Sequence, residues 1–142
     1  MTNIIDYVKN EYSFLIERNF AIDDVIERGN LYSQACLTGG SEDLIFCFTL
    51  EKGKLSVAVT SKHILNSKKY GKYSKYCDCF YLVKLFDPNI DFSDITPAIY
   101  PDFIQNNLNN LITLFNTENT ETTLKRINKI IKEYDQIRWN RQ

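Results

Sequence analysis

The sequence predicts an α+β fold: an N-terminal helix packed on an antiparallel meander of about four to five strands, followed by an antiparallel pair of C-terminal helices. Three patterns carry this prediction. Apolar residues recur at helical spacing in residues 3–18, two alternating segments flank a tight turn within 43–60, and helical patterns return in 102–116 and 120–137. No linker or repeat divides the 142 residues, so we expect one domain over 1–142.

Residues 3–18 are predicted to form the first helix. Asn3, followed by Asp6 three residues later, suits an N-terminal cap, because the acid lies near the positive end of the helix dipole. Arg18 and Asn19 are expected to end the helix. The side chains predicted to face the core are Ile4, Val8, Tyr12, Leu15 and Ile16.

The next pattern is weaker. Residues 22–28 are interpreted as a strand and residues 31–38 as a second strand, with a turn at Gly29-Asn30 between them. Asp23-Asp24 is unfavourable in a strand, so a short helix over 23–28 remains the alternative.

The hairpin within residues 43–60 is the clearest pattern of the chain. A glycine turn at 39–41 leads into it, and Lys52-Gly53 is its tight turn, because glycine readily takes the positive φ that such turns require. The resulting register places large apolar pairs on one face: Leu50 with Leu55, Phe48 with Val57, and Phe46 with Val59. It places small pairs on the other: Cys47 with Ala58, and Thr49 with Ser56.

Residues 61–79 are rich in Lys and Tyr and are predicted to be mainly an exposed loop. Residues 80–86, FYLVKLF, are nearly all apolar, which fits either a buried strand or a short buried helix. We favour a strand that joins the sheet and ends at 87–89.

All three prolines fall within residues 88–101, which predicts a loop. A helix follows at 102–116 with Asp102 as its N-cap, and another at 120–137 with Thr120 as its N-cap. Because the link between them is short, we expect the two helices to pack antiparallel.

The net charge of −1 predicts no bulk attraction to nucleic acid or to membranes. The charges nevertheless come in blocks. Residues 1–51 hold nine acids against three bases, 52–84 hold eight lysines against one acid, 85–118 hold five acids and no base, and 119–142 hold six bases against three acids. Such blocks either cancel in the folded chain or form separate faces that steer a charged partner.

Neither a secretory signal nor an apolar run of membrane-spanning length is recognisable. We therefore expect a cytoplasmic protein with no membrane contact and with four reduced thiols. These are Cys36, Cys47, Cys77 and Cys79.

No sequence motif points to catalysis. His63, the single histidine, is interpreted as a surface residue at a strand end rather than a general base. Cys77-Asp78-Cys79 lacks both a second zinc knuckle and the C-x-x-C spacing of a redox pair. The acid pairs Asp23-Asp24 and Glu42-Asp43 are interpreted as solvated turn residues. We predict no catalytic residue, no metal site and no cofactor.

The Lys/Tyr segment, residues 62–76, is the strongest candidate for binding. Its lysines are Lys62, Lys68, Lys69, Lys72 and Lys75, and its tyrosines are Tyr70, Tyr73 and Tyr76. Lysine contacts to phosphate with tyrosine stacking on bases would suit single-stranded nucleic acid. The segment contains no arginine, which binds phosphate more specifically than lysine does. This absence favours a solvated loop or a protein interface instead.

The order of the elements predicted over residues 4–60 also bears on function. A helix ending in YSFLIERNF is followed by a weak strand, a glycine turn and the hairpin DLIFCFTLEKGKLSVAV. This layout resembles the small cytosolic immunity proteins of bacterial polymorphic-toxin and contact-dependent growth inhibition systems. The resemblance implies a non-enzymatic protein that binds one cognate toxin domain and blocks it.

Two binding modes follow from this resemblance, and the sequence leaves both open. In the first mode, one of two acidic blocks would mimic phosphates against a basic toxin cleft: Asp23, Asp24, Glu27, Glu42 and Asp43, or Asp87, Asp91 and Asp94. In the second, the Lys/Tyr segment would meet an acidic catalytic site. The proposed contact residues of the Lys/Tyr segment are Lys62, Lys68, Lys69, Tyr70, Lys72, Tyr73 and Lys75. The alternatives are a small nucleic-acid-binding module that uses residues 62–76 and, least favoured, a small enzyme around His63 or the cysteines. The oligomeric state is not predicted.

Overall fold

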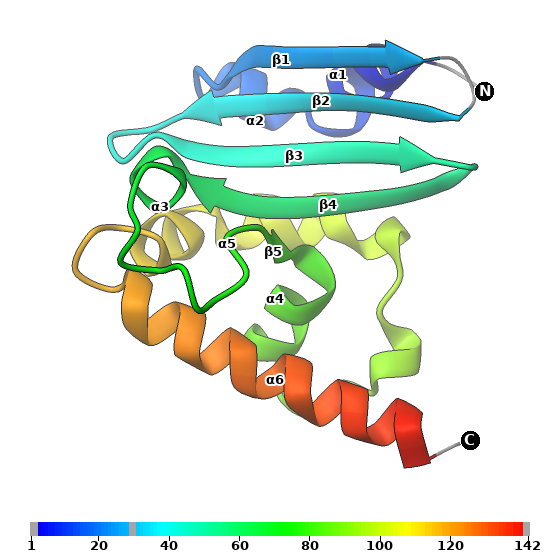
Figure 1. The fold of residues 1–142 in the computed structure, drawn as a ribbon. Helices are drawn as coiled ribbons and strands as arrows, with labels where there is room; N and C mark the ends of the chain where they lie inside the picture. Colours follow the sequence, from blue (N-terminus) through cyan, green and yellow to red (C-terminus); the bar gives the residue numbers. More distant parts are fainter. Residues whose placement is uncertain (1–2, 29–30, 141–142) are drawn as a thin grey trace.

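The computed structural model describes residues 3–28 and 31–140, and they adopt the predicted α+β fold. A five-stranded antiparallel sheet forms a meander in chain order, with helices behind it and along one edge (Figure 1). Its strands are β1 (Ala21–Arg28), β2 (Tyr32–Gly39), β3 (Leu44–Glu51), β4 (Lys54–Ser61) and β5 (Cys77–Asp78).

The hairpin of β3 and β4 has the predicted register. Leu50 lies opposite Leu55, and Cys47 lies opposite Ala58. Lys52 and Gly53 both have positive φ, 51° and 79°, which is the backbone of a type I′ turn. This turn matches the right-handed twist of the strands, so the two central residues fix the pairing along the whole hairpin.

Residues 23–28, for which a short helix was the alternative, lie in strand β1. β1 pairs with β2, and the pairing is shifted by a bulge at Asp24, whose φ is 53°. Asp tolerates this left-handed conformation better than most residues, which explains why an acid fits here. The bulge and the acids also protect β1, an edge strand, from pairing with other chains. The predicted turn at Gly29-Asn30 lies outside the described residues.

The predicted helix over 3–18 is two helices, α1 (Ile4–Glu11) and α2 (Ser13–Glu17). The break is at Tyr12, whose φ of −122° is not helical and whose ring packs 4.5 Å from that of Phe48. The cap is as predicted, because Asn3 Oδ1 accepts a hydrogen bond from the Asp6 amide at 2.9 Å. Both helices lie behind the sheet, where α1 packs on β2 and β3 (Figure 1).

The prediction of a strand over 80–86 is wrong. These residues belong to α4 (Cys79–Phe86), which begins because Asp78 Oδ1 accepts a hydrogen bond from the Phe80 amide at 2.9 Å. The fifth strand is the two-residue β5 just before it, which pairs with β4. The segment 61–79 also starts with a helical turn, α3 (Lys62–Leu65), capped by the Ser61 hydroxyl.

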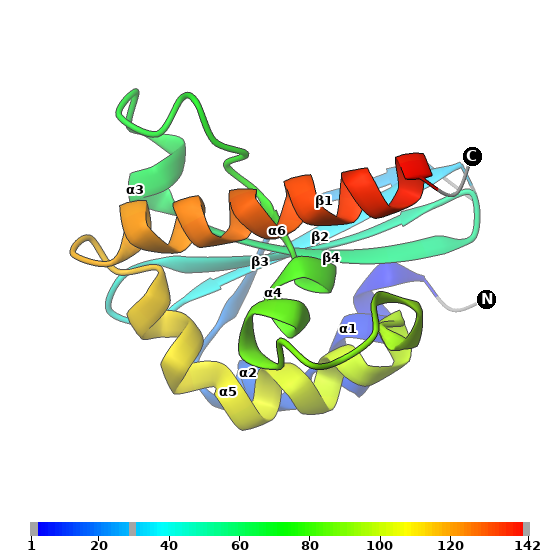
Figure 2. The ribbon, with the colours of Figure 1, turned by 90° about the horizontal axis from the view of Figure 1, so that it is seen from below.

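The C-terminal part contains two short 3-10 helices, η1 (Phe92–Asp94) and η2 (Pro97–Ile99), followed by α5 (Tyr100–Leu114) and α6 (Thr120–Asn140). α5 and α6 run in opposite directions, as predicted, with α4 lying between them (Figure 2). Asp102 is not the N-cap of α5 but lies in its first turn, because the helix begins two residues earlier. Thr120 does not accept an N-capping bond either; its hydroxyl donates to the Asn116 carbonyl at 2.6 Å.

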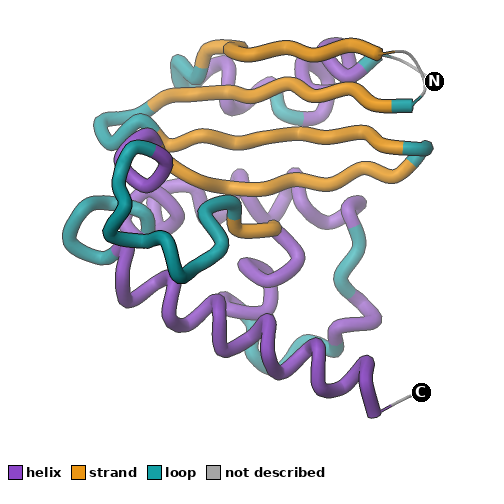
Figure 3. Tube along the Cα trace, in the orientation of Figure 1, coloured by secondary structure: helices purple, strands orange, loops and turns teal. Residues whose placement is uncertain are grey.

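The two faces of the sheet differ strongly. One continuous core extends from Ile4 to Ile127 and fills the space between the sheet and α1, α2, α4, α5 and α6. The other face carries a small cluster of Cys36, Ile45 and Cys47, against which Leu65 packs. We call this second face the open face. In Figure 3 the loop that follows α3 runs below β4 and leads to β5 at the lower edge of the sheet. None of the described helices is both long and apolar enough to cross a membrane.

Thr60 offers a test of the packing at the end of β4. Its side chain is completely buried, and its hydroxyl has no hydrogen-bond partner in the described part of the chain. Replacing the hydroxyl by a methyl group removes this desolvated polar atom at nearly constant volume. We expect Thr60→Val to raise the free energy of unfolding by about 1 kcal/mol, measured by urea denaturation. A loss of stability would instead reveal a partner for the hydroxyl.

Candidate functional site

The charged residues singled out in the sequence gather at one end of the sheet. Three segments meet there: the start of β1, the turn between β2 and β3, and α3 with the loop after it (Figure 1). A backbone hydrogen bond of 3.2 Å from the Lys62 amide to the Asp43 carbonyl links the last two. We call this surface the charged end. It consists of Asp23, Asp24, Glu42, Asp43, Lys62, Lys68, Lys69, Lys72 and Lys75.

Most of these charges face solvent. All are exposed except Glu42 and Lys75, which are half-buried. Among the described residues, the ion pair formed by this set joins Lys69 Nζ to Glu121 Oε2 at 4.0 Å, a solvent-exposed contact of little energetic weight. The acids and the lysines therefore do not neutralise one another in pairs, and both remain available to a partner.

The tyrosines of the Lys/Tyr segment separate into three environments. Tyr70 is only 5% exposed and its ring lies edge-on to His63 at 6.3 Å, so we remove it from the candidate contacts. Tyr73 is half-buried against the core, with Lys72 Nζ 5.3 Å from the centre of its ring. Tyr76 is 48% exposed.

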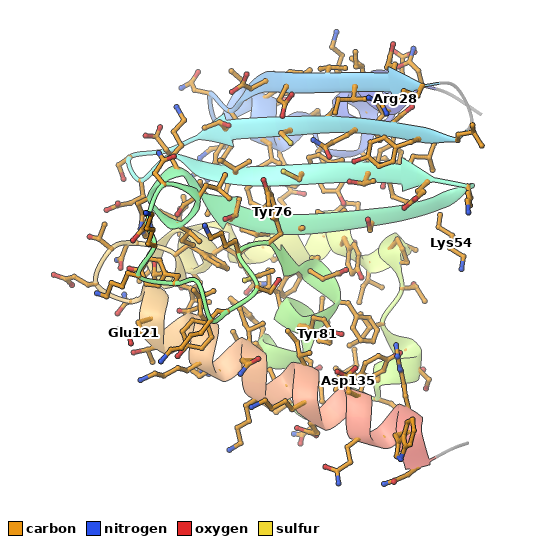
Figure 4. All side chains as sticks on the ribbon, in the orientation of Figure 1. Arg28, Lys54, Tyr76, Tyr81, Glu121 and Asp135 are labelled. Carbon is orange, nitrogen blue, oxygen red and sulfur yellow. The ribbon has the colours of Figure 1, made fainter. Side chains whose placement is uncertain are left out.

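Tyr76 was not among the predicted contacts, yet it connects the parts of this surface. Its ring extends from the loop over the open face of the sheet (Figure 4). Partial burial raises the pKa of its hydroxyl, and the nearby Cys47, Cys36 and Asp24 raise it further. The Tyr76 hydroxyl thus lies within electrostatic reach of the two cysteines and of Asp24.

His63 is a structural tether rather than a free surface side chain. Its Nε2 lies 2.7 Å from the Phe115 carbonyl oxygen and 3.3 Å from the Thr120 hydroxyl. A carbonyl oxygen can only accept a hydrogen bond, so Nε2 carries the hydrogen and donates. This bond joins α3 to the link between α5 and α6.

We expect His63→Ala to lower the free energy of unfolding by about 1–2 kcal/mol, because the Phe115 carbonyl loses its donor while half-buried. Urea denaturation followed by circular dichroism measures this. Lys62→Ala is the matched control: it changes the preceding, exposed residue of α3, and we expect it to stay close to the wild type. Equal effects of the two substitutions would contradict the tether.

The structure has clefts elsewhere. One of about 270 Å³ lies between α4, α5 and α6, one of about 340 Å³ adjoins it between α4 and α6, and both are lined by Leu85 and Arg126. Another, of about 360 Å³, lies at the turn between β3 and β4. Within the described residues, no three His, Cys, Asp or Glu side chains gather in a way that would hold a metal ion. The clefts lie apart from the charged end and bring together no nucleophile and base.

No family model, no curated protein and no solved structure matches this chain.

The sequence predicted most of the charged residues of this surface, but not how they are arranged in space. The charge blocks and the Lys/Tyr segment identified the charged residues, because composition alone reveals them. The exposure of Tyr76 and the burial of Tyr70 depend on how the loop returns to the sheet at β5, and a two-residue strand leaves no periodic pattern. The proximity of the acids to the lysines depends on the meander and on α3.

Proposed function

We propose that this protein binds a protein partner stoichiometrically through its charged end, as an immunity protein that neutralises a toxin domain in the cytoplasm. The observation that carries the proposal is the convergence of exposed acids and exposed lysines from three distant segments on one end of the sheet. Oppositely charged groups placed side by side yet left mostly without ion pairs favour the recognition of a charged partner.

The scaffold under this surface supports binding at low entropic cost. Asp24 and Asp43 sit at left-handed backbone positions, with φ of 53° and 50°, in a bulge and a turn held by the sheet. Their backbone positions are thus held relative to β2 and β3 before any partner arrives. Pre-ordered contacts favour affinity because less conformational freedom is lost on binding.

The charge layout specifies the chemistry of the partner. A complementary surface on the partner presents basic groups opposite the acids of β1 and of the β2–β3 turn. It presents acidic groups opposite the Lys/Tyr segment. Such a two-sign arrangement selects against partners of uniform charge, since either sign alone meets repulsion on half of the surface. That the partner is a toxin domain rests on the resemblance of residues 4–60 to immunity proteins.

The nucleic-acid alternative has less support. Stacking on single-stranded bases needs exposed aromatic faces, and two of the three tyrosines of the segment pack against the core. The acids of the β2–β3 turn lie beside the lysines and would repel phosphates. Tyr76 alone remains as an exposed ring.

Co-expression tests the proposal. A tagged copy of the chain is produced together with the toxin-type C-terminal domain encoded beside its gene. We expect rescue of growth and a 1:1 complex that survives affinity capture and light scattering. Growth arrest without complex formation would contradict the proposal. Nucleic acid that elutes with the protein and is released by salt would support the alternative.

A further inference from the structure

Two cysteines face each other on the open face of the sheet. Cys36 of β2 and Cys47 of β3 are direct cross-strand partners, and their Sγ atoms lie 2.8 Å apart. Both thiols are free in the structure. We propose that Cys36 and Cys47 form a redox-active dithiol that a small-molecule disulfide, such as oxidised glutathione, converts to a cross-strand disulfide. This inference does not depend on the proposed function.

The tight turn at Lys52-Gly53 explains why the two cysteines stand so close. In a two-residue hairpin the residues that flank the turn form a hydrogen-bonded pair, and such pairs recur at every second position. Counted from the turn, Cys47 and Ala58 are therefore hydrogen-bonded partners. Because a strand residue directs both its backbone groups to the same neighbour, Cys47 makes no ladder bond to Cys36.

Non-hydrogen-bonded pairs bring the two backbones nearer. Their Cα atoms are about 4.5 Å apart, inside the range of roughly 4.4–6.8 Å that disulfides span. The S–S bond is about 2.05 Å long, so the 2.8 Å between the sulfur atoms closes by less than one ångström of movement. The pair is thus placed for bond formation without a change of register.

The surroundings set this pair apart from the other two cysteines. Cys36 and Cys47 belong to the small cluster on the open face, and Tyr76, an exposed loop side chain, extends toward them. Cys77 and Cys79 lie in the main core under the helices. Cys36 and Cys47 are 6% and 7% exposed, whereas Cys77 and Cys79 are 2% and 0% exposed, so the first pair is the more accessible to an oxidant.

The hydrogen bonds assign different roles to the two thiols. The Sγ atoms of Cys36 and Cys47 share a hydrogen bond of 2.8 Å in which either thiol can donate, and Cys36 Sγ also accepts a hydrogen bond from the Gln34 amide nitrogen at 3.6 Å. The bond with Cys47 lowers the pKa of Cys36, and the same bond, together with burial, raises the pKa of Cys47. Cys36 is therefore the attacking sulfur and Cys47 the resolving one.

The reaction is two successive thiol–disulfide exchanges. The Cys36 thiolate attacks one sulfur of oxidised glutathione, which forms a mixed disulfide and releases one glutathione thiolate. Cys47 then gives its proton to solvent and attacks the Cys36 sulfur, which forms the protein disulfide and releases the second glutathione. Two protein thiols are oxidised, and one glutathione disulfide is reduced to two thiols.

The test uses the reduced full-length chain incubated with oxidised glutathione and analysed by mass spectrometry. We expect the intact protein to lose the mass of two hydrogens and to regain it with dithiothreitol. Cleavage after Glu42, which lies between the two cysteines, separates them into two peptides. These peptides should remain joined until the reductant is added.

Serine substitutions provide the controls. Cys77→Ser should form the same disulfide, whereas Cys36→Ser should not lose the two hydrogens. Cys47→Ser should stop at the first step and carry one glutathione on Cys36. An unchanged mass of the wild type, or a disulfide that maps to Cys77 and Cys79, would overturn the proposal, and neither result depends on a variant that folds.

Discussion

Phe48→Ala should lower the free energy of unfolding by about 3–5 kcal/mol, the cost of a large cavity in a closely packed core. Phe48 is completely buried at the centre of β3, and its ring lies 4.5 Å from that of Tyr12, at the break between α1 and α2. Truncation would remove one of the contacts that hold the N-terminal helices against the sheet. Urea denaturation measures the loss.

Thr49→Ala is the matched control for Phe48→Ala. Thr49 is the next residue of β3, on the opposite face, and its half-buried side chain lies between its cross-strand partners Gln34 and Ser56. We expect an effect below about 1 kcal/mol, because little packing is lost. If both substitutions cost the same, the assignment of the two faces would be wrong.

Reversing the charge of two lysines in the Lys/Tyr segment should strongly weaken binding of the proposed partner. We expect the double substitution Lys68→Glu with Lys72→Glu to raise the Kd roughly 100-fold, since each change sets like charges against each other in the complex. Both lysines are exposed, so the fold should be retained. The association rate should fall most at low salt, because exposed charges act at long range only when little screened.

The matched control places the same charge change elsewhere. Lys129 and Lys132 are exposed on α6, beyond the charged end, and their double reversal alters the net charge equally. Calorimetric titration should find the affinity of this variant within about threefold of the wild type, because exposed charges beyond a Debye length are largely screened. Equal losses in the two variants would mean that net charge, and not the loop, governs binding.

The hairpin and the failed strand show what sequence patterns can and cannot predict here. The register of β3 and β4 was predictable because the turn at Lys52-Gly53 and the period-two alternation agree. Residues 80–86 are nearly all apolar because α4 packs against β4 and α6 and its remaining side chains are half-buried, so the segment has no clear polar face that would show its helical period. The cap at Asp78 was the remaining local signal for a helix.

The need for a glycine at position 39 of β2 could not be predicted from the sequence. It was interpreted as part of a turn, but it is the last residue of β2, and a Cβ there would lie 2.7 Å from the Phe20 ring and 2.9 Å from the Phe20 backbone. The glycine is needed for this close approach, which involves a residue 19 positions away in the chain. The pairing of Cys36 with Cys47 was likewise beyond local patterns, because it depends on the register between β2 and β3.

Backbone hydrogen exchange of the protein, alone and with the proposed toxin-domain partner, tests the binding surface most directly. The account predicts slower exchange in the turn between β2 and β3 and in the loop after α3, with unchanged exchange at the β3–β4 turn and along the C-terminal half of α6. Protection confined to the groove between α4, α5 and α6, or no protection at the charged end, would contradict it.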